Sequence, residues 1–188
     1  VELPMAVIVR RFTIEFVAED VPALGYKTFT IKSVESTPKF ESPVKAEGNT
    51  VSNGLISVTP SGGGVTIATL DGPLPPVERV GYFEDGGDVG DEYRYVKPEN
   101  DLIVTTADAT PKVTVIDHEP VCATIEMTTI MKLPVSATDD ERGRAVETVD
   151  CTITSRYTVT AGSARVDVAT EVHNLAKDHR LRALFPSN

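Results

Sequence analysis

Five carboxylates fall within nine positions of the chain, in a stretch that begins at Glu84, ends at Glu92 and includes Asp85, Asp88 and Asp91. Three glycines stand among them, and aromatic residues flank the stretch on both sides. Paired carboxylates can hydrolyse a glycosidic bond, oxygen ligands on a glycine-rich turn suit calcium, and an aromatic ring beside a carboxylate suits a sugar. A solvated turn is the fourth interpretation, and the residues of the stretch alone leave all four open.

Other chemistry finds less support along the chain. The acidic stretch does not match the EF-hand loop and is not repeated, as calcium-binding β-rolls require. There is no G-x-S-x-G nucleophile elbow, and the three histidines, His118, His173 and His179, lack the short spacing of zinc ligands on one element. The sequence therefore predicts neither a nucleophilic site nor a metal site within this chain.

The end of the chain, from His173 onward, is the other dense stretch. As a strand it would place Leu181 and Phe185 on one face, with Arg180 and Arg182 on the other. We expect these arginines to pair with the acidic stretch across a sheet, which would contribute about 1 kcal/mol or less at the surface.

Composition and charge limit the classes of function. The 188 residues carry 18 basic and 28 acidic side chains, a formal net charge of −10. Such a balance argues against nucleic acid and against anionic membranes as partners. No apolar run approaches the roughly 18 residues of a membrane span. Cys122 and Cys151 form no disulfide framework; we expect two reduced thiols and a cytoplasmic location.

The hydrophobic pattern has a period of two, which is typical of antiparallel strands with one buried face. Valine, isoleucine and threonine dominate the segments that show it, and no long window favours an amphipathic helix. We therefore expect an all-β fold with almost no helix, a large antiparallel sandwich built from long strands. The clearest expected strands are 112–117, 121–133, 146–160 and 164–174.

Glycine and proline suggest how the chain is divided. Val1–Lys32 is expected to form two strands with a turn near Pro22, and the polar segment Ser33–Asn49 is expected to be a linker. We accordingly predict a small β-element with its linker over residues 1–49 and a large β-sandwich over residues 50–188. The chain does not begin with Met, and we expect the sandwich to continue beyond Asn188, which would leave open sheet edges here.

Three segments in order resemble the C-terminal β-region of glycoside hydrolase family 38, the α-mannosidases, and most closely the bacterial branch. They are VPALGYKTFTIK at Val21–Lys32, EDGGDVGDEYRYVKP at Glu84–Pro98 and VHNLAKDHRLRALFP at Val172–Pro186. The resemblance implies a β-supersandwich like that of galactose mutarotase. It also implies a parent enzyme, a retaining α-mannosidase whose zinc and nucleophile lie in a separate N-terminal catalytic domain.

On this resemblance the chain is not catalytic alone, and no catalytic, metal or cofactor residue is assigned to it. Its implied partners are the catalytic domain of the same parent chain and a mannose-containing carbohydrate, and an oligomer is possible. We assign the rim of the sugar pocket or the interface with the catalytic domain to Asp88, Asp91, Glu92, Tyr93 and Arg94.

Two points stay open beside this hypothesis. In some family members an arginine of a DDERG loop reaches the active site; here DDERG spans Asp139–Gly143, at a different place in the order of segments, so Arg142 is not assigned. The alternative function is a stand-alone carbohydrate-binding or adhesive β-sandwich module with no enzyme attached.

Overall fold

The computed structural model describes residues 11, 13–14, 16–36 and 41–187, and the chain divides into two compact units, Val1–Lys39 and Phe40–Asn188. None of the described residues lies in a helix. The described residues accordingly contain no helix with the length and hydropathy of a membrane span. The all-β, antiparallel, helix-poor fold expected from the period-two pattern is confirmed.

The first unit holds a turn at Pro22–Gly25, where the Gly25 amide donates to the Pro22 carbonyl at 3.1 Å. The rings of Phe16 and Phe29 lie 4.8 Å apart, edge to face, across this turn. The described part of Val1–Lys32 contains no strand, in contrast to the two strands expected there. Residues 1–10, 12 and 15 lie outside the described residues, so much of the first expected strand is not tested.

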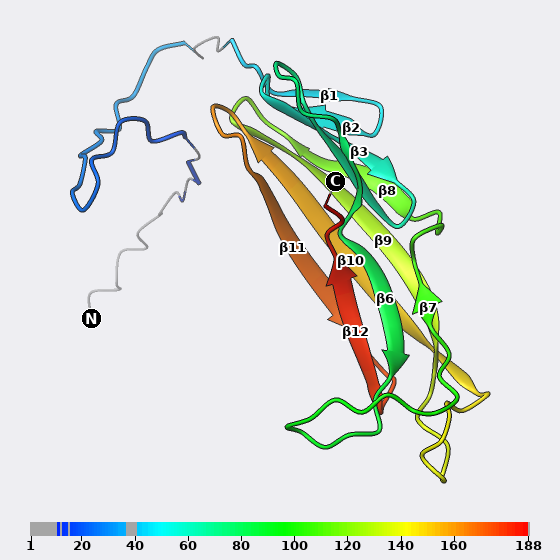
Figure 1. Cartoon of the computed structure of the whole chain (residues 1–188). Helices are drawn as coiled ribbons and strands as arrows, with labels where there is room; N and C mark the ends of the chain where they lie inside the picture. The colour runs from blue at the N-terminus through cyan, green and yellow to red at the C-terminus, as the bar shows by residue number, and fades with distance from the viewer. Residues whose placement is uncertain (1–10, 12, 15, 37–40, 188) are drawn as a thin grey trace, which may run out of the picture. The chain divides into compact units, whose positions relative to one another are not determined.

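The second unit is a sandwich of three antiparallel sheets (Figure 1). The four-stranded sheet, in the order β11-β10-β9-β8, consists of β8 (Lys112–His118), β9 (Cys122–Pro134), β10 (Thr148–Thr160) and β11 (Val166–His173). The five-stranded sheet, in chain order, consists of β1 (Lys45–Glu47), β2 (Thr50–Ser52), β3 (Ile56–Ser61), β4 (Gly64–Thr69) and β5 (Val77–Val80). The three-stranded sheet, in the order β12-β6-β7, consists of β12 (His179–Leu184), β6 (Tyr82–Gly87) and β7 (Val104–Thr105).

The four long strands predicted from alternation are all present, within a few residues of their expected ends. The division predicted between residues 49 and 50 stays a prediction, although β1 lies within the segment read as a linker and pairs with β2 around Gly48. Gly48 has a positive φ of 59°, which a glycine adopts without strain.

Strands β9 and β10 are each 13 residues long and pack against both of the other sheets. One core cluster joins Ile125 and Tyr157 to the five-stranded sheet, and a second joins Leu133 and Ile153 to Phe83 of the three-stranded sheet. Burial alternates along β10, as a strand with one wet face requires. The long hairpin is therefore the platform on which the rest of the sandwich is assembled.

Two loops lie together at one end of the sandwich, the lower end in Figure 1. The first, called the acidic loop below, follows β6 and spans residues 88–103, which include the second half of the acidic stretch; the second joins β9 to β10 and spans residues 135–147. The Asn100 amide donates to the Arg142 carbonyl at 2.7 Å, and Asn100 and Gly143 form an isolated bridge. The backbones of the two loops are thus joined directly.

Candidate functional site: a buried ion cluster beneath two surface loops

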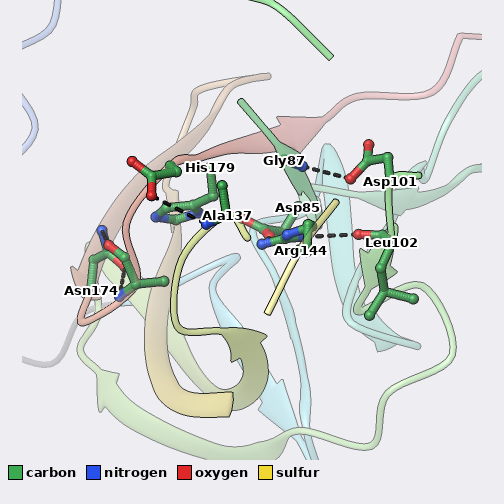
Figure 2. Close-up of polar contacts among 10 residues, drawn as sticks. Asp85, Gly87, Asp101, Leu102, Ala137, Arg144, Asn174 and His179 are labelled. Atoms are coloured by element: carbon green, nitrogen blue, oxygen red, sulfur yellow. Dashed lines mark hydrogen bonds and ion pairs between the residues drawn. The ribbon is translucent and has the colours of Figure 1, made fainter. Parts of the chain in front are cut away.

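Asp85 is the centre of a buried ion cluster at the end of the sandwich where the two loops meet (Figure 2). Its Oδ1 accepts from Arg144 Nη2 at 2.6 Å, and its Oδ2 lies against His179 Nδ1. The side chains of Asp85, Arg144 and His179 are 0%, 2% and 8% exposed. A carboxylate is seldom buried this completely without opposite charge and hydrogen bonds, and this one has both.

The three members come from three separate elements. Asp85 lies on the inner face of β6 with Phe83, Arg144 belongs to the 135–147 loop, and His179 begins β12. The register of β12 on β6 places His179 opposite Gly87, two residues beyond Asp85. His179 and Asp85 are therefore diagonal neighbours on the same face of adjacent strands, a separation that an imidazole can span.

The glycine pair at 86–87 is part of a strand and not a flexible turn. A Cβ added to Gly87 would lie 2.6 Å from Cγ of Pro98, and one added to Gly86 would lie 3.0 Å from Cδ1 of Ile103. The segment 98–103 packs against β6 at this distance only because both residues lack a side chain. This close approach brings Asp101 within reach of the β6 backbone.

Further hydrogen bonds fix the loops around the cluster. Asp101 Oδ1 accepts from the Gly87 amide at 2.8 Å, and Arg144 Nη1 donates to the Leu102 carbonyl at 2.8 Å. Asp178 Oδ2 accepts from the Ala137 amide at 3.2 Å, next to His179. Arg144 therefore holds both loops at once, one through its own backbone and the other through its guanidinium (Figure 2).

Two carboxylates of the acidic loop accept hydrogen bonds from the loop's own backbone. Asp88 Oδ1 accepts from the amides of Gly90 and Val96, both at 3.0 Å. Asp91 Oδ1 accepts from the amides of Tyr93 and Arg94 at 3.0 and 2.9 Å. Both carboxylates therefore stabilise the loop's own backbone, as Asp does in turns.

The structure brings the five residues predicted for the rim together on one exposed turn. Asp91 and Arg94 bridge its base, and the ring of Tyr93 at its tip is 89% exposed. Because this segment is a turn, Tyr93 and Tyr95 do not share a face as an extended strand would require. Tyr95 instead lies beneath Arg180, whose guanidinium carbon is 3.7 Å from the ring centroid.

The predicted pairing of the last strand's arginines with the acidic stretch is confirmed for Arg182 and is wrong for Arg180, which stacks on Tyr95 instead. Arg182 on β12 forms an ion pair with Glu84 on the neighbouring strand β6. Arg142, which sequence reasoning left unassigned, forms an ion pair with Glu99 at 2.7 Å and so links the two loops at their surface.

In the 135–147 loop, Asp140 is held by its neighbours. Its Oδ1 accepts from the Thr138 hydroxyl at 2.7 Å and from the Arg142 amide at 3.2 Å. These hydrogen bonds, the first being the larger contribution, lower the pKa of Asp140 below its usual range because they favour the charged carboxylate.

The titratable groups around the cluster do not form a metal or nucleophilic centre. Within the described residues, no group of three or more His, Cys, Asp and Glu side chains could hold a metal ion. Cys151 is a free thiol whose pKa is raised by burial and by the nearby Asp85 charge, so it is a poor nucleophile. Cys122 forms no disulfide with Cys151, because it lies far along the hairpin, opposite Thr160, whereas Cys151 lies opposite Met131.

Sequence reasoning missed Arg144 and Asp101 and weighed His179 only as a zinc ligand. Arg144 and His179 are 59 and 94 residues from Asp85 along the chain. One signal was present: a strand at the end of the chain was expected to pair with the acidic stretch. Extending that expectation to the register would have placed His179 beside Asp85.

Comparisons with known proteins agree with this architecture. No family model matches the chain. A candidate mannosylglycerate hydrolase of Halalkalibacterium halodurans is 31% identical over 122 residues, which cover 57% of this chain and 14% of that protein. A crystal structure of a glycosyl hydrolase family 38 protein from Enterococcus faecalis matches with a TM-score of 0.74 and 30% identity, over 80% of this chain and 20% of that one. An α-mannosidase from Enterococcus faecalis V583 matches with a TM-score of 0.73 and 31% identity, over 79% of this chain and 19% of that one.

The fold and the joined loops define an all-β sandwich domain. The comparisons confirm its resemblance to glycoside hydrolase family 38 and relate it to one segment of such proteins. The chain spans about one fifth of the two solved relatives and about one seventh of the curated one.

Proposed function

We propose that this chain is the β-sandwich domain of a retaining α-mannosidase, where it buttresses the catalytic domain and shapes the rim of the sugar pocket. The observation that carries the proposal is the end of the sandwich at which two loops are fixed to the core by Asp85, Arg144 and His179. A surface that binds another domain or a sugar needs its contact residues held in a fixed position, and the buried cluster fixes the two loops in this way. The similarity to family 38 supplies the parent enzyme.

The exposed groups on this surface suit contact and not acid–base chemistry. Tyr93 presents an almost fully exposed ring, and Val146 in the facing loop is 99% exposed. An aromatic ring can stack on the apolar face of a sugar or anchor an interface between domains. Asp88 and Asp91 each use Oδ1 to accept from backbone amides, and the carboxylate of Asp85 is buried in an ion pair, so we assign to all three a structural role and not that of the nucleophile.

Zinc belongs to the proposal only through the parent enzyme. The described residues contain no cluster that fits a zinc ion, so no step of the reaction is assigned to zinc held by this chain. The chemistry would be carried out by the catalytic domain that the resemblance implies. Cys122 and Cys151 form no disulfide, which fits the cytoplasmic location that we propose for the protein.

The test uses the longer polypeptide that contains this chain, with an aryl α-mannoside as substrate. Replacing Tyr93 or Arg94 by alanine should lower kcat/KM by about tenfold, which corresponds to about 1.4 kcal/mol of lost transition-state stabilisation. Arg165→Ala is the matched control, because Arg165 is also exposed but lies at the β10–β11 turn. Unchanged kcat/KM in both loop variants would remove the rim role.

A second measurement separates this proposal from a stand-alone sugar-binding module. The 188-residue chain, supplied with zinc, should not hydrolyse the aryl mannoside, and titration with mannose should give no binding at millimolar concentrations. Hydrolysis by this chain alone would contradict the assignment of catalysis to another domain. Mannose binding at millimolar or lower concentration would favour the module.

A further inference from the structure

The hydrophobic core ends abruptly between β10 and β11. The register pairs Tyr157 with Val168 and Ile153 with Val172, and paired residues of neighbouring strands point to the same face. Tyr157 and Ile153 are each 1% exposed, whereas Val168 and Val172 are 44% and 39% exposed. Strand β11 therefore carries an apolar row on the core side of its sheet that no described layer covers.

The opposite edge of the same sheet does not show this feature. On β8, Val113 and Val115 are partly buried and pack against the core cluster under the five-stranded sheet. On β11, Val166 at the end of the strand is the residue that packs against this cluster, and Val168 and Val172 pack against neither cluster. The missing cover thus distinguishes β11 from β8, the other edge strand of the same sheet.

The edge of β11 is also open for hydrogen bonding. The strand is eight residues long and is paired with β10 on one side only. Its sequence, VDVATEVH, contains no proline or lysine, the residues that commonly protect such an edge. Its acidic side chains, Asp167 and Glu171, pair with residues of the outer face of β10, so the core side carries three valines and Thr170, with no charge among them.

We infer that β11 is an internal strand of a wider sheet, completed by a β-strand from the remainder of the polypeptide outside these 188 residues. This strand would pair with the free edge of β11, and a layer of apolar side chains would cover Val168 and Val172. The occupant is taken from the parent polypeptide because the solved relatives are about five times as long as the aligned part of this chain. The added strand should carry apolar residues at alternate positions, with lysine, arginine or threonine opposite Asp167 and Glu171.

A pair of variants in the longer polypeptide tests the inference. Val168→Glu places a charge on the core side of β11, and Ala169→Glu places the same charge one residue along on the outer face, opposite Arg156. If the face is covered, Val168→Glu lowers the melting temperature of the β-domain by several degrees and Ala169→Glu does not. Equal and small effects of both variants would overturn the inference.

The same variants in the 188-residue chain identify the occupant. Here the side chain of Val168 is already in water, so Val168→Glu should change the melting temperature no more than Ala169→Glu. A larger loss from Val168→Glu in this chain would mean that residues 1–39 or a second copy cover the face, which overturns the assignment to the remainder of the polypeptide. A molar mass from light scattering distinguishes those two cases.

Hydrogen exchange gives a readout that needs no variant. In the longer polypeptide at concentrations where it is monomeric, every amide of Val166–His173 should be protected, because both edges of β11 are paired. Fast exchange at alternate amides of the strand would show a free edge and would contradict the inference. Neither experiment measures hydrolysis, so the inference can fail or hold independently of the proposed mannosidase role.

Discussion

Asp85 and Asp88 are three residues apart in the same acidic stretch, yet their environments are opposite. Asp85 is buried and joins β6 to partners 59 and 94 residues away. Asp88 is near the surface, and the amides that it accepts from are two and eight residues away. The first aspartate fastens distant parts of the chain together, and the second shapes only its own loop.

This difference shows that a high density of carboxylates does not define a site. The stretch crosses from the inner face of a strand into a surface turn, and the role of each carboxylate changes with its depth. The energetic consequence is large, because an unpaired charge costs far more in the interior than at the surface. Variants of the buried Asp85 and variants of the surface loop around Asp88 therefore test the comparison separately.

The largest effect is expected from Asp85→Asn, which keeps the shape of the side chain and removes its charge. Arg144 would then be buried without a counter-charge, and breaking such a pair typically costs about 3–5 kcal/mol. Urea unfolding of the 188-residue chain measures the loss. The control is Asp88→Asn, which should cost a few tenths of a kcal/mol because the amide oxygen still accepts hydrogen bonds. Similar losses in the two variants would contradict the comparison.

A smaller loss is expected when the backbone of the acidic loop is disturbed. A Cβ added to Gly90 would lie 1.8 Å from the Arg94 carbonyl oxygen, so the loop must open in Gly90→Ala. Overpacking of this kind costs about 1–3 kcal/mol. Hydrogen exchange at the Val96 amide reports the opening, because that amide donates to Asp88 in the closed loop.

Gly143→Ala is the matched variant in the facing loop. Its Cβ would approach the Asn100 carbonyl oxygen to 3.4 Å, an ordinary contact distance. Its unfolding free energy should therefore stay close to that of the unmodified chain. In Gly90→Ala, by contrast, the Val96 amide should exchange faster than in the unmodified chain. An unchanged exchange rate of that amide would contradict the described conformation of the acidic loop.

The next smaller loss of unfolding free energy is expected when only the hydrogen bonds that Asp88 accepts are removed. Asp88→Ala removes the acceptor for the amides of Gly90 and Val96, which are near the surface and can turn to water. The expected cost is about 1 kcal/mol in urea unfolding. A cost as large as that of Asp85→Asn would mean that Asp88 also supports the core.

The smallest effect concerns Asp140, a fully exposed carboxylate of the facing loop. Its pKa is lowered chiefly by the Thr138 hydroxyl, so the folded state favours the charged form. Stability from this source is present above the ordinary aspartate pKa of about 4 and is lost as the pH falls through the lowered value. Thr138→Val should raise the pKa of Asp140 in an NMR titration, and Thr138→Ser should keep it low. An unchanged pKa in Thr138→Val would exclude the hydroxyl as its cause.

Alternation of valine, isoleucine and threonine predicted β8–β11 because it depends on nearest neighbours along one strand. The gaps between the expected strands 121–133, 146–160 and 164–174 have the same local origin, since glycine, serine and proline restrict the backbone locally. The strand pairing of the acidic stretch with the last strand followed from the opposite charges of the two segments. These features need no knowledge of what lies across the core.

The sequence by itself thus determined the class of fold, its long central hairpin and the acidic stretch to which Asp85 belongs. Only the tertiary structure decided which of the carboxylates is buried and which side chains meet it. The register of β12 on β6 selects His179, and the path of the 135–147 loop selects Arg144, and both depend on packing between segments far apart in the chain. Burial then sets the energy of the pair, because the strength of an ionic contact follows from the solvent around it and not from the identity of the two residues.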